Sequence, residues 1–229
     1  MKKITIILIV ALLLLTSTVL AVNLNNMKIE IPEEYYDLKT AIDNNDTKVA
    51  YYEALLKTTK EELKQQIETS NIVYLGKNTN LSKTLMISEA QSGVTKKIFH
   101  LHMATEEQIG ELKEQLKEEA TSQTMYIENM TVYEVNGIRW LESSIRSGTD
   151  AITQYYTIVN GKSITISLQS AYSNTKQGEL KEIIDTVEFT NLEEKPADFT
   201  DFIIIAVTAV LVLIVVVLMV MAFSKKKEQ

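Results

Sequence analysis

Hydrophobic and polar residues follow three patterns along this chain of 229 residues. Two segments, residues 4–22 and 202–223, are almost continuously apolar. Between them, apolar residues recur with helical spacing in some segments and alternate with polar residues in others, which is typical of helices and of half-buried strands. The sequence therefore predicts an α+β domain between two apolar segments.

The apolar segment 202–223 predicts a transmembrane helix. Its 22 residues carry no charge, and at about 1.5 Å per residue they cover about 33 Å, enough for a hydrocarbon core of about 30 Å. The tail after it, residues 224–229, contains three consecutive lysines. Since positive flanks stay in the cytoplasm, we expect a single-pass cell-membrane protein with this tail inside and residues 22–201 outside.

Residues 1–21 are typical of a secretory signal peptide. Lys2 and Lys3 precede an apolar core, and Val19 and Ala21 occupy the −3 and −1 positions of a cleavage site. The alternative is an uncleaved anchor helix over residues 4–22, which is just long enough to span a bilayer. Either interpretation leaves the middle of the chain outside the cytoplasm.

The outward region divides into a domain, residues 22–191, and a short polar stalk, residues 192–201. Polar capping residues predict four helix starts: near Thr47 after the turn cluster 43–46, at Thr59 with Glu62, at Thr105 with Gln108, and at Asn174 with Gln177. Alternation predicts strands over residues 27–31, 71–75, 83–89, 97–103, 126–135, 138–145, 152–159 and 163–170.

Two Asn-Gly pairs, Asn136-Gly137 and Asn160-Gly161, predict tight hairpin turns, because both residues of a type I′ turn need a positive φ. In the strand after the second turn, Ile164, Ile166 and Leu168 fall on one face and the residues between them on the other. We expect the isoleucine face to point into the core.

Charge and composition narrow the classes of function. The whole chain has 23 Lys+Arg and 30 Asp+Glu, a formal charge of −7, and residues 22–201 alone carry about −11. An acidic domain disfavours nucleic acid as a partner and opposes self-association, so we expect a monomeric domain. Cys is absent, which excludes disulfides, thiolate metal sites and a cysteine nucleophile.

Three segments carry a resemblance to a known family: Ile31-Pro-Glu-Glu-Tyr35, Gln154-Tyr-Tyr-Thr-Ile-Val-Asn-Gly-Lys162 with the Ile-x-Ile-x-Leu strand after it, and Ile183-Ile-Asp-Thr-Val-Glu-Phe189. Over roughly residues 25–190 the chain resembles the PsbP-like superfamily. The resemblance implies an antiparallel sheet with helices on both faces, a fold shared with a Ran-binding nuclear import factor. It also implies a non-catalytic accessory or binding module. We expect no cofactor. The superfamily has no catalytic motif, so no site residue is carried over.

His100 and His102 are the two histidines of the chain. Two positions apart on a strand they would share a face, and with Glu106 or Glu107 they could ligate zinc. The alternative is that they are ordinary residues of that strand face. The metal hypothesis leads to a rival function, a metal-dependent envelope enzyme.

A second candidate site combines Arg139, Trp140, Tyr155 and Tyr156, because arginine and large aromatic residues dominate the energetics of protein interfaces. The alternative is that Trp140 fills the core and Arg139 pairs with a nearby carboxylate. The leading hypothesis is thus a membrane-anchored, non-enzymatic binding or accessory module that recognises a protein or another envelope component.

The topology has a direct test. Protease added to intact cells should remove the domain at 22–191 and spare a tag placed after Gln229, because the tag lies behind the membrane. Permeabilised cells are the control, in which the tag should also be digested. Digestion of the tag in intact cells would overturn the orientation.

Overall fold

The structure is a computed structural model that describes residues 19–24, 26–56, 58–79, 82–91, 97–122, 125–147, 150–171 and 178–196. The chain divides into two compact units, Met1–Glu193 and Glu194–Gln229, and every element below lies in the first. The transmembrane helix expected at 202–223, the tail at 224–229 and most of the signal peptide at 1–21 lie outside the described residues. No helix within the described ranges is long and apolar enough to cross a membrane.

The largest element is a seven-stranded antiparallel sheet. Its strands lie, in spatial order, as β3 (Tyr35–Asp37), β4 (Ile72–Asn78), β5 (Lys83–Ala90), β9 (Lys162–Ala171), β8 (Asp150–Val159), β7 (Ile138–Ser147) and β6 (Tyr126–Val135). All but the short β3 were expected from the sequence, with ends that differ by a few residues. The fold is therefore of the α+β class, as predicted.

A second, three-stranded sheet has β2 (Met27–Pro32) at its centre, between β1 (Val19–Leu24) and β10 (Glu188–Phe189). The β2 strand was predicted, whereas the other two were not. The signal peptide cleavage expected after Ala21 falls within β1, so cleavage there would leave Val22–Leu24 paired with β2.

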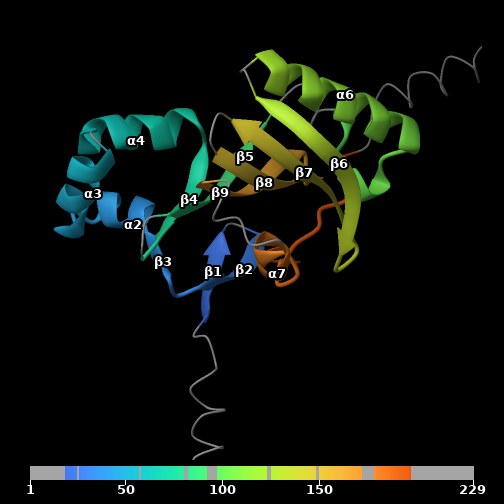
Figure 1. The fold of residues 1–229 in the computed structure, drawn as a ribbon. Helices are drawn as coiled ribbons and strands as arrows, with labels where there is room; N and C mark the ends of the chain where they lie inside the picture. Colours follow the sequence, from blue (N-terminus) through green and yellow to red (C-terminus); the bar gives the residue numbers. More distant parts are fainter. Residues whose placement is uncertain are drawn as a thin grey trace, which may run out of the picture. The chain divides into compact units, whose positions relative to one another are not determined.

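Helices lie against both faces of the large sheet (Figure 1). On one face, α2 (Leu38–Asp43), α3 (Lys48–Leu56) and α4 (Lys60–Thr69) group beside β3 and β4, and α6 (Glu106–Ser122) lies beside β6 and β7. On the other face lie the small sheet and α7 (Glu179–Ile184). The expectation of an antiparallel sheet covered by helices on both faces is confirmed.

Local sequence signals explain most helix starts. The capping box of Thr59 and Glu62 is formed in both directions at α4, and Thr105 and Gln108 exchange the same pair of bonds at α6. The start of α7 differs from the prediction, because its N-cap is Gly178 with φ 87° and no side-chain bond. The expected caps Asn174 and Gln177 lie outside the described residues.

Both predicted hairpin turns are confirmed. Asn136 and Gly137 have φ of 51° and 73°, and Asn160 and Gly161 have φ of 53° and 68°. The first turn joins β6 to β7 and the second joins β8 to β9. These turns set the register within two hairpins, which contain four of the seven strands of the large sheet.

The strand predicted over 97–103 is not formed. The segment instead ends in a 3₁₀ helix, η1 (Leu101–Met103), whose backbone bonds are local: Met103 N donates to His100 O and Ala104 N to Leu101 O. Leu101 is fully buried under β7 and β8. The turn places Leu101 in the core, and the alternation pattern does not reveal it.

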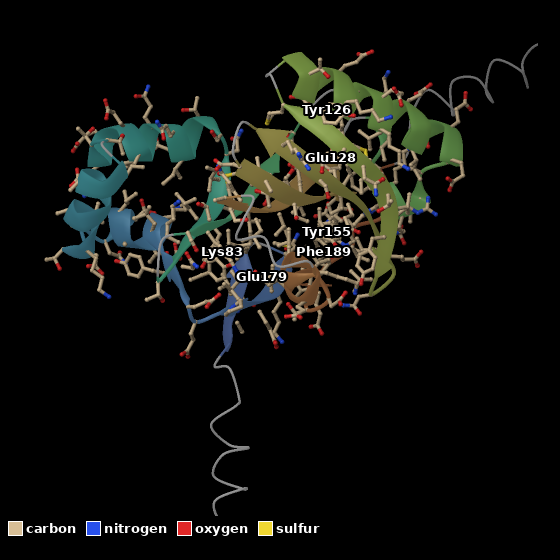
Figure 2. All side chains as sticks on the ribbon, in the orientation of Figure 1. Lys83, Tyr126, Glu128, Tyr155, Glu179 and Phe189 are labelled. Carbon is tan, nitrogen blue, oxygen red and sulfur yellow. The ribbon has the colours of Figure 1, made fainter. Side chains whose placement is uncertain are left out.

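The core is divided by the sheet, because β7 and β8 carry apolar side chains on both faces. Trp140 and Tyr155 pack with Phe189 on the side of the small sheet, where Figure 2 shows Tyr155 and Phe189 close together. Leu141 and Tyr156 pack on the side of α6. An ion pair between Lys83 and Glu179, both mostly buried, joins β5 to α7.

Glu179 also accepts a hydrogen bond of 2.9 Å from the Tyr35 hydroxyl, so one carboxylate ties together β3, β5 and α7 (Figure 2). Burial raises the pKa of the Tyr35 hydroxyl, and the bond to Glu179 raises it further. The phenol therefore stays neutral and donates its proton. This network fixes the first turn of α7 against the large sheet.

A substitution by aspartate should lower the free energy of unfolding by different amounts on the two faces of β9. Ile166 is fully buried, so Ile166→Asp should lower the free energy of unfolding by more than about 3 kcal/mol, since the buried charge has no partner. Thr165 is partly exposed at the edge of a cleft, and Thr165→Asp should cost about 1 kcal/mol or less. Urea denaturation measures both, and equal midpoints would contradict the assigned facing.

Candidate functional site

A cleft of about 1010 Å³ lies between α6 and the face of the large sheet. Ligand sites usually occupy about 300–1,000 Å³ and combine apolar walls with a few polar groups. The apolar part of the lining comes from α6, the segment before it and the strands: Ile98, Leu112, Leu116, Ala120, Met125, Ile127, Met130, Leu141, Ile145 and Tyr156. The cleft thus has the size and lining of a binding site.

The floor of the cleft contains a row of polar side chains. Ser143 on β7 lies opposite Gln154 on β8, and both line the cleft. Thr165 and Ser163 on β9 line it as well. Ser143 is buried and Gln154 is partly exposed. Polar groups at the floor of an otherwise apolar cleft can orient a ligand by hydrogen bonds.

One rim of the cleft is a polar row along α6. Gln108, Glu111, Gln115 and Glu118 line the cleft and follow one another at helical spacing. The buried row of the same helix, Ile109, Leu112 and Ala120, lies beside it. Three glutamates, counting Glu119, and one lysine, Lys97, are the charged residues among the described lining, so the cleft is acidic.

Tyr156 on β8 is a buried tyrosine in the lining of the cleft. Burial raises the pKa of its phenol to about 12; a hydrogen bond with Ser163 counteracts this in part, and the negative charge of Glu119 adds to the rise. Ser163 in turn donates to Ala90 O at 3.1 Å. Burial and the charge of Glu119 thus keep the phenol neutral at physiological pH, so it acts in the cleft as a hydrogen-bonding group.

The four residues of the predicted interface do not gather on one surface. Trp140 and Tyr155 have no exposed area and belong to the core beside the small sheet. Arg139 and Tyr156 lie on the other face of the sheet. Arg139 donates to Ala104 O at 3.2 Å and lies 3.6 Å from Glu106, so it ties β7 to the start of α6. Of the four, Tyr156 alone lines the cleft.

The histidines lie at the Asn160-Gly161 turn. The backbone N–H of Asn160 donates to His100 Nδ1 at 3.4 Å, so Nε2 carries the proton and donates to Glu193 O at 2.8 Å. Both nitrogens of His100 are therefore engaged with backbone groups. The ring of His102 lies 5.0 Å from that of His100, and burial lowers the pKa of His102, with His100 and Arg139 acting in the same direction.

This arrangement does not favour the rival hypothesis of a metal-dependent enzyme, because His100 would have to give up a backbone bond to bind a metal. Within the described ranges, no group of three or more His, Cys, Asp or Glu side chains is placed to hold a metal ion. Asn160 accepts from Glu193 N and donates to Asn191 O, both at 2.9 Å. His100 and Asn160 together thus hold residues 191–193, the last residues of the first unit.

A second hollow, of about 240 Å³, lies on the opposite face between the two sheets. It is lined by residues such as Met27, Ile87, Ile164 and Phe189, and the ion pair of Lys162 with Glu89 lies at its edge. Its volume is below the usual range of ligand sites. The cleft beside α6 is therefore the better candidate.

No family model matches this chain, and no curated protein matches it in sequence. Among solved structures, it is similar to cyanobacterial PsbP (CyanoP) from Synechocystis sp. PCC 6803, with a TM-score of 0.48 and 9% identity over 76% of this chain and 93% of that one. A protein of Bacteroides thetaiotaomicron VPI-5482 gives a TM-score of 0.39 and 13% identity, over 76% and 48% of the two chains. These similarities carry no information on function.

The cleft was not predicted from the sequence, although two signals for it are present. One is the row of Gln108, Glu111, Gln115 and Glu118 next to the apolar row of α6. The other is Gln154 in a strand whose later residues are buried on both faces. Each signal is also typical of an exposed surface. Only the packing of α6 against the sheet brings them to one place.

The raised pKa of Tyr156 predicts a loss of stability in alkali. A tyrosine in the unfolded chain titrates near 10, whereas Tyr156 in the fold titrates at about 12. Between these values the unfolded chain loses the proton first, so stability is complete below about pH 10 and falls as pH rises to about 12. Tyr156→Phe should remove this contribution, on the order of 2 kcal/mol, and make the melting temperature less sensitive to pH in that window.

Thermal melting at a series of pH values measures the effect. Tyr126→Phe is the matched control, because it removes a hydroxyl from a side chain that is 68% exposed. A pH dependence of Tyr156→Phe equal to that of the parent protein would show that the phenol is not shielded from water in the cleft.

Proposed function

We propose that this protein is a single-pass, membrane-anchored surface protein of the PsbP-like type, whose outward domain is a non-enzymatic binding or accessory module. The apolar segments 1–21 and 202–223, with the lysines after the second, support the anchoring and the orientation. The motifs at residues 31–35, 154–162 and 183–189 and the α+β architecture support the PsbP-like assignment.

The observation that carries the binding function is the cleft beside α6. It has the volume of a ligand site, an apolar floor crossed by polar side chains, and an acidic rim. The residues around it are a tyrosine held neutral, serines, glutamines and glutamates. These groups bind and orient a ligand through hydrogen bonds and charge, so the cleft is the site at which a partner of the module would dock.

A photo-crosslinking residue in the full-length chain tests this in intact cells. Gln115 is exposed on the rim of the cleft, and a benzoylphenylalanine there should form an adduct with the occupant. The same residue at Gln65, an exposed position on α4, is the matched control and should form none. Gln154→Trp, which fills the floor of the cleft, should abolish the adduct at position 115.

The outcomes are distinct. An adduct at position 115 that disappears with Gln154→Trp supports the cleft as the binding site. Equal adducts at positions 115 and 65, or an adduct that Gln154→Trp leaves unchanged, would overturn it. Circular dichroism of each variant checks that the domain remains folded, and Thr165→Ser serves as a conservative change in the same cleft that should keep the adduct.

A further inference from the structure

We propose that the occupant of the cleft is an amphipathic peptide helix that carries basic residues two turns apart. This inference rests on the proposed binding function and adds the class of ligand. It follows from three properties of the cleft: its apolar floor, the spacing of the charges on its rim, and its size.

The apolar floor requires an apolar face on the ligand. Leu116 on α6 and Ile127 and Met130 on β6 line the cleft and keep part of their apolar surface exposed, above the buried cluster that contains Leu112, Leu141 and Tyr156. An amphipathic helix laid into a groove buries one row of side chains against such a surface. A purely polar ligand would leave this part of the lining without a partner.

The rim sets the charge of the ligand and its spacing. Glu111 and Glu118 both line the cleft from α6. Seven residues of helix at about 1.5 Å each place their backbone positions about 10.5 Å apart on the same side of the helix. A second helix lying along α6 presents the same spacing between residues i and i+7. Lysine or arginine at these two positions would therefore meet both carboxylates at once.

The size agrees with this occupant. Two turns of an α-helix, about 10 Å across and about 11 Å long, fill roughly 850 Å³, and the cleft measures about 1010 Å³. Gln108 and Gln115 on the same rim can hydrogen-bond to polar side chains of the ligand. The net charge of about −11 on residues 22–201 also attracts a basic segment over a longer range.

A matched pair of double variants tests the charge spacing. Glu111→Gln with Glu118→Gln removes the two rim charges. Glu61→Gln with Glu68→Gln removes two exposed charges at the same seven-residue spacing on α4, away from the cleft lining. Both double variants change the net charge equally. Any difference between them therefore reports on the cleft and not on the overall charge.

The probe is a designed 15-residue peptide of leucine, alanine and two lysines seven positions apart, labelled for fluorescence anisotropy. The full-length chain is held in nanodiscs of phosphatidylcholine, and empty nanodiscs give the background. The rim double variant should weaken binding by about fivefold or more, as expected for the loss of two partly exposed ion pairs. The α4 double variant should change it by less than about twofold. A peptide with its lysines five positions apart should bind the parent protein as weakly as the original peptide binds the rim double variant.

Four outcomes would overturn the proposal: no binding of the peptide, equal weakening by both double variants, no preference for the seven-residue spacing, or displacement by spermidine at the peptide's own affinity. The last would indicate a small polyamine. The crosslink at position 115 distinguishes a failure of the basic-helix proposal from a failure of the proposed binding function. An adduct there that the rim double variant leaves unchanged would refute the basic helix as the ligand and keep the cleft as a site. Melting curves confirm that the exposed substitutions leave the fold intact.

Discussion

Parts of β7 and β8 must be kept from water on both faces, and much of the structure follows from this constraint. Neighbouring residues such as Trp140 and Leu141, or Tyr155 and Tyr156, point to opposite sides and are all buried. A sheet of this kind needs two covering layers. Here a small sheet with α7 covers one face and helices cover the other.

The cleft arises because the helical layer is incomplete. A helix is about 10 Å wide and strands are about 4.8 Å apart, so one helix covers about two strands. The helices α2–α4 lie on β3 and β4, and α6 lies beside β6 and β7. The strands between these groups carry Gln154, Ser163 and Thr165 toward the cleft. Polar side chains thus lie where no helix covers the sheet. Water can hydrogen-bond to them there, so their burial cost is avoided.

The features that can be predicted from the sequence are those that depend on residues close together in the chain. The Asn-Gly turns, the capping boxes of α4 and α6 and the alternation of β9 each depend on a few neighbouring residues, and each is formed as expected. Long-range packing decides the rest. The strands β1 and β10 are short segments that pair with β2, and η1 is a single turn that places Leu101 in the core. The cleft combines α6 with four strands, and no single segment contains its pattern.

The position of β2 between β1 and β10 also determines when the domain can be completed during synthesis. The contact between Thr190 and Asn26 beside this small sheet joins residues 164 positions apart. Closing such a loop is slow, since its entropy must be lost before the contact forms. An emerging chain can pair β1 with β2 and build the Asn-Gly hairpins early, but the small sheet is complete only when β10 joins β2. The last segment of the domain to leave the ribosome or a translocation channel is therefore the one that closes it.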